Sequence, residues 1–233
     1  MKYLFFVLTV FLASACNNTK RGSGVIIKEP RTVKTFDAVA ASGSIKADVK
    51  TGAIASVIIE TDDNIMPFVE SNVSNGILKI KLRDINILRN STVYVHIINP
   101  EFKSVTTSAS PQITSDEVIV TSEKMVLKAS SGSSINVKID APAVSGDASS
   151  GAEISVQGKT RDVNSNSSSG ATINFSNLQA ETAKATVSSG ASISLFASIS
   201  ILANATSGGE INYKGGATSV KKNVSSGGSV NQQ

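Results

Sequence analysis

The chain has 233 residues, of which 40% are hydrophobic, and a formal net charge of +4. This apolar content is enough to bury a core and argues against a disordered chain. Aromatic residues make up only 5%, Trp is absent, and Lys and Arg are scattered without a basic stripe interleaved with aromatics; the composition favours thin layers of Ile, Val, Leu and Ala, and nucleic acid is not expected as a partner.

The first 15 residues have the pattern of a secretory signal peptide: one lysine, an apolar run over residues 3–12, and then small residues. That run is too short to span a bilayer, and no later stretch approaches the ~20 apolar residues that a span requires. Residues 13–16, Ala-Ser-Ala-Cys, resemble the lipobox of bacterial lipoproteins, although the leucine preferred three places before the cysteine stands four places before it, at Leu12. We therefore predict lipidation of Cys16. A plain signal peptide that leaves a free thiol is the alternative.

Lipidated Cys16 would anchor the chain to a membrane, since each buried methylene contributes about 0.8 kcal/mol. Residues 16–32 are then expected to be the lipidated cysteine followed by a polar tether, because residues 17–24 are Asn, Thr, Lys, Arg, Gly and Ser.

Residues 33–120 are expected to form a β-rich but irregular N-terminal part. Short apolar runs at residues 57–59, 77–82 and 93–97 have the composition of strands. Asp62, Asp63 and Asn64 precede a short apolar run that contains Pro67, which predicts one brief helical turn capped by acidic side chains.

Residues 121–233 carry an internal repeat with a period of about 19 residues, marked by Gly132, Gly151, Gly170, Gly190, Gly208 and Gly227. Three places after each glycine stands a β-branched aliphatic residue: Ile135, Ile154, Ile173, Ile193, Ile211 or Val230. Two places further on are Val137, Val156, Phe175, Leu195 and Tyr213, the period-two spacing of one strand face. A second apolar strand precedes each glycine. Self-similarity at this period predicts an all-β, right-handed parallel β-helix-like solenoid with about 19-residue coils.

The glycines are predicted to be structural corner residues. Each stands in a Ser-Ser-Gly sequence or a close variant, between two short strands. A coil of this length must turn sharply, and glycine reaches positive φ without the ~1–2 kcal/mol that a Cβ costs. Degenerate copies at residues 42–45 and 108–113, the latter with Ser110 in the glycine slot, extend the same pattern into the N-terminal part.

The sequence offers few candidates for chemistry, and no catalytic residue, metal site or cofactor is predicted. His96 is the only histidine and alternates with Val95 and Ile97, as an outward strand residue would. Asp162 and Glu181 both stand eleven places after a repeat glycine and would stack one coil apart, where they could bind calcium or act as acid and base. Lysine and arginine side chains nearby favour instead a solvated surface of mixed charge. Polar columns beside the glycines could form a flat hydroxyl array that recognises sugars or ice, or could simply complete the corners.

The order of several short motifs resembles the head GIN domain family of putative auto-transporter adhesins, which is common among envelope lipoproteins of Bacteroidota. The matching segments are residues 36–39 with Ser42-Gly43, residues 62–65, residues 75–80, residues 211–216 and residues 225–230. They cover the chain from about Val33 to Val230. The resemblance implies a β-helix-like fold and a surface or adhesin role, and it implies no catalytic residues.

The function expected from these observations is that of a non-enzymatic, lipid-anchored cell-envelope protein that presents a β-helical surface for binding protein or glycan. A carbohydrate-active β-helix enzyme and a purely structural envelope component are the alternatives. The expected location is the outer membrane. Whether the chain faces the periplasm or the cell surface stays open, since residues 17–20 lack the acidic residues of a surface-export signal.

Overall fold

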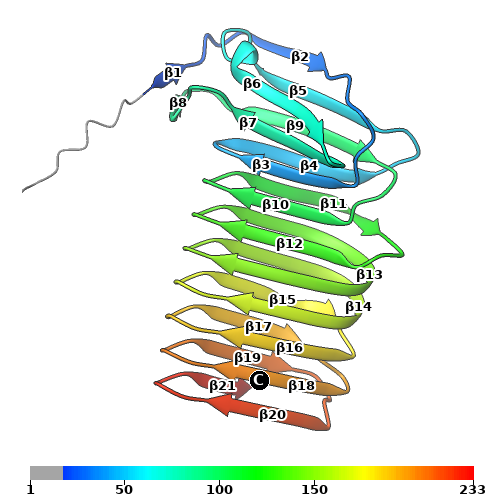
Figure 1. Ribbon diagram of the computed structural model, residues 1–233, viewed down its shortest axis with the longest axis vertical. Coiled ribbons are helices and arrows are strands. Elements are labelled where there is room, and N and C mark those ends of the chain that lie inside the picture. Colours follow the sequence, from blue (N-terminus) through cyan, green and yellow to red (C-terminus); the bar gives the residue numbers. More distant parts are fainter. Residues whose placement is uncertain (1–17) are drawn as a thin grey trace, which may run out of the picture.

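The computed structural model describes residues 18–233 as an elongated stack of flat coils (Figure 1). The predicted signal peptide and Cys16 lie outside these described residues. Within residues 18–233 no helix is long and apolar enough to cross a membrane. The one helical element of that part of the chain is a single 3-10 turn, η1 (Met66–Phe68).

Strands make up nearly all of the regular structure. They are β1 (Thr19–Arg21), β2 (Ile26–Pro30), β3 (Ala38–Ser42), β4 (Ile45–Thr51), β5 (Ser56–Asp62), β6 (Val69–Ser74), β7 (Ile77–Leu82), β8 (Ile87–Arg89), β9 (Val93–Asn99), β10 (Ser104–Ser108), β11 (Gln112–Val120), β12 (Met125–Ser130), β13 (Ser134–Ser149), β14 (Glu153–Ser167), β15 (Thr172–Gln179), β16 (Thr182–Val187), β17 (Ser192–Phe196), β18 (Ser200–Ala205), β19 (Glu210–Lys214), β20 (Ser219–Val224) and β21 (Ser229–Gln232).

Each coil contributes one strand to each of two sheets, and both sheets are parallel from coil to coil. The pre-corner sheet holds the strands that run into the glycine corners: β3, β10, β12, the second halves of β13 and β14, β16, β18 and β20. The post-corner sheet holds the strands that leave them: β4, β11, the first halves of β13 and β14, β15, β17, β19 and β21. The regular part of the stack, marked by the six repeat glycines, has about six turns of about 20 residues, which confirms the predicted solenoid.

The core lies between the two sheets and consists of stacked aliphatic columns. In the post-corner sheet the predicted isoleucines pair in register, and Ile135, Ile154, Ile173, Ile193 and Ile211 are each at most 1% exposed. Met125, Val144, Val163, Ala183 and Ile201 form a buried column in the pre-corner sheet. Each buried aliphatic side chain of this size contributes about 1.5–3 kcal/mol, so the columns stabilise the stack without a large aromatic core.

The corners are tight turns in which the residue before glycine also has positive φ. All six repeat glycines have φ between 67° and 74°, and the serines that precede them have φ between 49° and 55°. In the corner of Ser149, Ser150 and Gly151, the Ala152 N–H donates to the Ser149 carbonyl at 3.2 Å, so two left-handed residues form a type I′ turn. The Gly151 N–H donates to the Ser169 carbonyl of the next coil at 3.1 Å. The hydrogen-bond ladder therefore continues through the corner.

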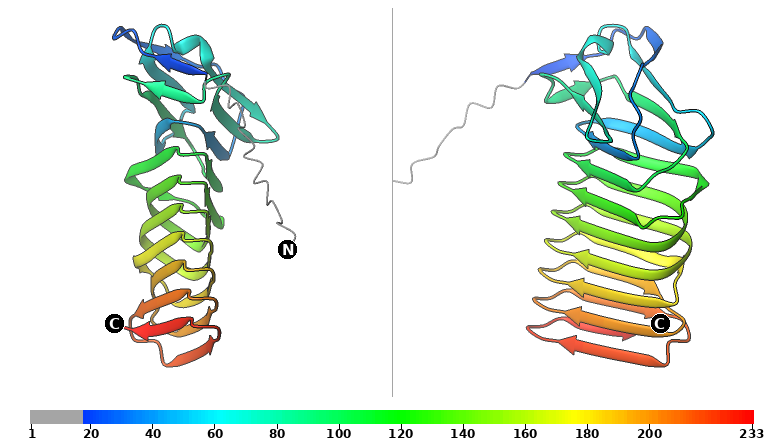
Figure 2. Two further views of the ribbon diagram at one scale, coloured as in Figure 1. Left: turned by 90° about the vertical axis from the view of Figure 1, so that its left-hand side faces the viewer. Right: turned by 45° about the vertical axis from the view of Figure 1, so that its right-hand side comes forward.

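The N-terminal part stacks in a different order from the chain. β3 and β4 form a complete coil around Gly43, but this coil lies between β7 and β9 on one side and β10 and β11 on the other. Beyond it, β5 pairs antiparallel with β9, β2 with β5, and β6 with β7. These antiparallel strands cover the N-terminal end of the stack (Figure 2). We call β1, β2, β5–β9 and η1 the cap.

The segment expected to be a polar tether is in part ordered as strands of the cap. β1 pairs in parallel with β8, and β2 pairs antiparallel with β5. The expectation is therefore wrong for Thr19–Arg21 and Ile26–Pro30. Sequence composition could not show this, because the partners of both strands lie 28 to 68 residues further along the chain, from Pro30 with Ile58 to Thr19 with Ile87.

Asp62 holds this N-terminal segment in place. The predicted helical turn is present as η1, but its N-cap residue Ile65 receives no side-chain hydrogen bond, so the expected acidic capping is wrong. The Asp62 carboxylate instead accepts the Gly24 N–H at 2.6 Å and the Ser91 hydroxyl at 2.5 Å. The side chain is 1% exposed. The hydroxyl bond from Ser91, helped by the Gly24 N–H, outweighs the cost of burial and lowers the pKa of Asp62 below its usual value of 3.8.

We expect this carboxylate to make stability depend on pH. A folded-state pKa below 3.8 contributes stability that is fully present above that value and is lost as the pH falls through the folded pKa. The melting temperature of the native protein should therefore drop from about pH 5 downward, and Asp62→Asn should be less stable at neutral pH with a smaller drop. Thermal melts across this range test it, with the exposed Asp140→Asn as control. A drop equally steep in Asp62→Asn would contradict the assignment.

Candidate ligand-binding surface

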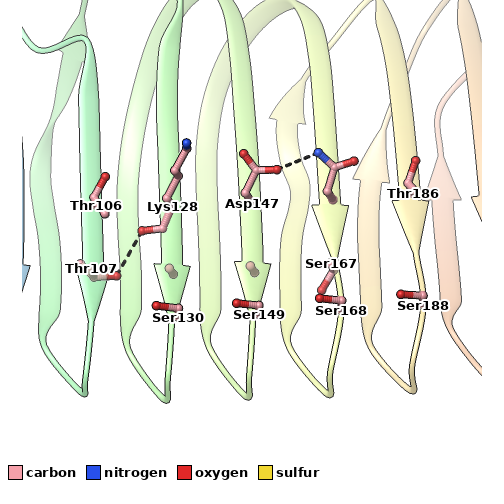
Figure 3. Close-up of a pocket in the computed structure, with 13 residues that line it drawn as sticks. Thr106, Thr107, Lys128, Ser130, Asp147, Ser149, Ser167, Ser168, Thr186 and Ser188 are labelled. Atoms are coloured by element: carbon pink, nitrogen blue, oxygen red, sulfur yellow. Dashed lines mark hydrogen bonds between the residues drawn. The ribbon is translucent and has the colours of Figure 1, made fainter.

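The outer face of the pre-corner sheet carries two parallel rows of polar side chains, one residue from each coil (Figure 3). The polar column, four places before each glycine, pairs in register and consists of Thr106, Lys128, Asp147, Asn166 and Thr186. The serine column, two places before each glycine, consists of Ser130, Ser149, Ser168 and Ser188. Both rows exist because side chains alternate along each strand and every coil repeats the alternation in the same register.

The two columns line a shallow groove of about 460 Å³. Its remaining lining residues are Thr107, Ala129, Ala148 and Ser167. Coils stack about 4.8 Å apart, so the five coils from Thr106 to Thr186 span about 19 Å. The groove is therefore elongated along the stack, and it offers an approaching ligand hydroxyl, amide, ammonium and carboxylate groups, while its lining includes no large apolar side chain.

The centre of the polar column combines three kinds of hydrogen-bonding group. The Asn166 amide donates to the Asp147 carboxylate at 2.7 Å. That bond fixes the amide so that its own oxygen stays available as an acceptor. Lys128, one coil before Asp147, has only donors, and a carboxylate has only acceptors. The centre of the groove thus presents both donors and acceptors, which suits a polar ligand with hydroxyl or amide groups.

The sequence contained a usable signal for these residues. A hydroxyl array was one of two interpretations of the polar columns beside the glycines, and the serine column has the form of such an array. The position four places before each glycine was not singled out, although its residues are polar in every regular coil: Lys128, Asp147, Asn166, Thr186, Asn204 and Asn223. A column that is polar throughout, next to columns that are apolar throughout, identifies an outward face.

Asp162 and Glu181 do not stack as expected. Asp162 pairs with Thr182, while the Glu181 N–H donates to the Arg161 carbonyl. The cause is a bulge at Ser176, where the register shifts by one residue between β14 and β15. A 20-residue coil therefore places Glu181 one position away from Asp162.

The environment of Asp162 is that of an ion pair. Its carboxylate accepts a hydrogen bond from the Arg161 guanidinium at 2.8 Å and one from the Thr182 hydroxyl at 2.8 Å. These two bonds, the Arg161 bond first, lower the pKa of Asp162. A general acid needs a raised pKa, so this environment does not favour Asp162 as a general acid.

His96 lies on the surface of β9, as its alternation with buried neighbours predicted, and its side chain is 39% exposed. Its Nδ1 is 2.5 Å from the Asp48 carboxylate and its Nε2 is 3.5 Å from that of Glu60, which also pairs with Lys28. The pKa of Glu60 is lowered, mainly by the hydrogen bond from Lys28. In residues 18–233 no three His, Cys, Asp or Glu side chains are grouped so as to hold a metal ion.

Comparison with known proteins gives both a family and a set of similar structures. The family model described as "Putative auto-transporter adhesin, head GIN domain" matches residues 35–217. A solved structure of a putative adhesin from Bacteroides fragilis is 16% identical, with a TM-score of 0.83 over 92% of this chain and 100% of the other. A putative lipid binding protein from Parabacteroides distasonis is 19% identical, with a TM-score of 0.73 over 92% and 99%. A putative adhesin from Parabacteroides merdae is 14% identical, with a TM-score of 0.72 over 92% and 99%.

None of the curated proteins is similar enough in sequence to count as a match. At these identities the solved structures establish that the fold is shared. They carry no information on which ligand the groove takes.

Proposed function

Because the chain belongs to the family of putative auto-transporter adhesins with a head GIN domain, we propose that it is a non-enzymatic cell-envelope protein, lipid-anchored through Cys16, that binds a glycan in the groove of the pre-corner sheet. The family description supports an extracellular or envelope-associated location. The observation that carries the glycan assignment is the polar column, which repeats hydrogen-bonding groups in register along five coils.

A repeating surface suits a repeating ligand. Consecutive coils present one polar side chain each at a constant spacing of about 4.8 Å, so an extended polymer lying along the stack meets equivalent groups at each step. Glycans carry hydroxyl groups that both donate and accept, and Lys128, Asp147 and Asn166 supply the complementary donors and acceptors. Each neutral hydrogen bond contributes about 0.5–1.5 kcal/mol and each charged one about 1.5–3 kcal/mol, so several together give a measurable affinity.

The same groove is less suited to a peptide. A peptide that binds by strand addition needs an unpaired strand edge, and β12, β13, β14 and β16 are each paired on both sides along this face. Protein interfaces also depend on buried aromatic or arginine anchors, and the groove lining contains neither. A hydroxyl-rich ligand remains the better match.

We expect Asp147→Ala to weaken glycan binding about 10- to 100-fold, since it removes a charged acceptor from the middle of the groove. Asn136→Ala, an exposed change on the opposite sheet, serves as the control and should leave the affinity unchanged. A glycan array identifies the ligand, and titration calorimetry then measures the affinity of each variant. Equal affinities of the two variants would remove the groove from the proposal.

The remaining parts of the proposal have separate tests. Incorporation of labelled fatty acid into the native chain, and its loss in Cys16→Ala, tests the anchor. Cleavage of any polysaccharide by the purified protein would favour a carbohydrate-active enzyme instead. Absence of glycan binding together with crosslinks only to envelope proteins would favour a structural component.

A further inference from the structure

The cap carries a group of basic side chains that no carboxylate neutralises. Lys20 and Arg21 lie on β1, and Arg89 lies on the paired strand β8; all three are exposed. Ten ion pairs with N–O distances of 4.0 Å or less exist within residues 18–233, and none includes these three residues. The acids around the cap have other partners: Asp62 accepts bonds from Gly24 and Ser91, Asp63 accepts the Ser23 hydroxyl, and Glu70 pairs with Lys81 and Arg83.

The positions of the two arginines are unfavourable in the isolated protein. Arg21 and Arg89 are direct register partners in the parallel pair of β1 and β8, so their side chains lie side by side on one face of this two-stranded sheet. Like charges in neighbouring positions on adjacent strands repel each other. An anionic surface placed against them would replace that repulsion by attraction, and each guanidinium can form two hydrogen bonds with a phosphate group.

Large apolar side chains are exposed at the same end of the stack. Val25 and Ile26 are 56% and 55% exposed, and Ile27 and Ile87 are each 37% exposed. Ile87 lies on β8 with Arg89, while Ile26 lines a groove together with Asn90 and Tyr94. Lys20 lies on the opposite face of β1 from Arg21, and its ammonium is 4.7 Å from the centre of the Phe68 ring, a cation–π contact. Basic side chains mixed with exposed aliphatic ones are the composition of surfaces that bind the interface of a bilayer.

We propose that the cap is a membrane-docking surface, in which Arg21 and Arg89 contact anionic lipid headgroups from one face of β1 and β8, Lys20 adds its charge from the other face, and Val25 and Ile26 enter the interface. This inference deepens the proposed lipid anchoring, on which its cellular setting rests. Cys16 precedes Thr19 by three residues, a span of about 11 Å at most. An acyl anchor at Cys16 would therefore hold β1 close to the headgroup layer.

Docking through the cap also determines which parts of the molecule face away from the membrane. β1 and β8 lie at one end of the stack, and β20 and β21 lie at the opposite end (Figures 1 and 2). The coils that carry the polar column lie between these ends. Binding through the cap leaves the glycan groove accessible, which an adhesin requires.

Vesicle co-sedimentation of residues 18–233, which contain all the described strands and the core, tests this proposal without the acyl chain. We expect binding to vesicles containing anionic phosphatidylglycerol, little binding to pure phosphatidylcholine, and weaker binding as salt increases. The triple change Lys20→Gln, Arg21→Gln, Arg89→Gln should lower the partition coefficient about 100-fold, because each basic residue near an anionic surface contributes a factor of about five. Val25→Ser with Ile26→Ser should lower it about tenfold.

The matched control is Lys159→Gln, Lys184→Gln, Lys221→Gln, which removes the same charge from exposed positions on the solenoid and should change the partition coefficient less than twofold. Equal loss in both triple variants would overturn the docking surface and leave only a net-charge effect. Release by inorganic phosphate but not by chloride at equal ionic strength would also overturn it, since that indicates a discrete anion site. Neither result depends on acylation of Cys16, so failure of the anchor is detected separately by the fatty-acid labelling.

Discussion

Phe175→Ala is expected to lower the free energy of unfolding by about 3–5 kcal/mol. Phe175 is fully buried, at 0% exposure, in the second inward column of the post-corner sheet. It is one of the largest side chains in a core made mostly of Ile, Val, Leu and Ala, so its removal leaves a cavity that the small neighbours cannot fill. Natural domains are stable by only about 5–15 kcal/mol in total.

The space for this ring is provided by a glycine in the facing sheet. A Cβ placed on Gly146 would lie 2.6 Å from the Phe175 Cζ atom, and the register neighbour of Gly146, Ser165, is also small and fully buried. Gly146→Ala should therefore cost about 1–3 kcal/mol in the native background through overpacking. In a Phe175→Leu background the same change should cost much less, because the two positions share one space.

Equilibrium unfolding in urea of the two single variants and the double variant measures this coupling. Thr172→Ala, on the exposed face of the same strand, is the control and should stay within about 0.5 kcal/mol of the native protein. A loss below 1 kcal/mol for Phe175→Ala, or additive effects in the cycle, would show that the two sheets do not face each other in the register described.

Gly158→Ala is expected to cost about 2–5 kcal/mol, although this glycine lies outside the repeat column. Gly158 has a φ of 126°, where a side chain adds about 1–2 kcal/mol of backbone strain. A Cβ there would also overlap the carbonyl oxygen of Ile139, its register partner in the preceding coil. That oxygen is main chain and cannot move without breaking the ladder, so overpacking adds a further 1–3 kcal/mol or more.

Gly151→Ala separates the two causes of this loss. Gly151 also has positive φ, at 69°, but a Cβ there would meet no atom within 4 Å. Gly151→Ala should therefore lower the free energy of unfolding only by the backbone strain of about 1–2 kcal/mol. Thermal and urea unfolding of both variants compare the positions, and a loss in Gly151→Ala as large as that in Gly158→Ala would contradict the close approach at Ile139.

The repeat columns made the solenoid predictable. Ile135, Ile154 and Ile173 recur with the corner glycines at nearly constant spacing, and a period of about 19 residues with two-residue alternation has few solutions other than stacked coils. The positive φ of glycines such as Gly151 followed from the need to turn sharply. That Ser150 shares the left-handed conformation was not foreseen, because serine pays a steric cost there that only the inter-coil hydrogen bonds of the corner offset.

The candidate site was predictable only as a class of surface. Polar columns beside the glycines were expected, and the serine column is one of them. The pairing of Asp162 with Glu181 was wrong, because counting from the glycines assumes equal coils and the bulge at Ser176 adds one residue. Bulges depend on local packing between neighbouring coils, which a count of residues does not contain.

Local and repeating features, namely the coil length, the corner positions, and the inward and outward faces, were encoded in the sequence alone, since each depends on the two-residue period of a strand and on the conformational freedom of glycine. Long-range pairing decided the rest. Strands about 40 to 70 residues apart pair where the β3–β4 coil is inserted between β7 and β9 on one side and β10 and β11 on the other. The same holds for β1 and β8, whose pairing brings Arg21 beside Arg89. Such contacts form because unpaired strand edges and exposed aliphatic faces must be covered at the end of a stack. Several strands of the chain could cover them, so the sequence pattern does not specify the partner and only the tertiary structure shows it.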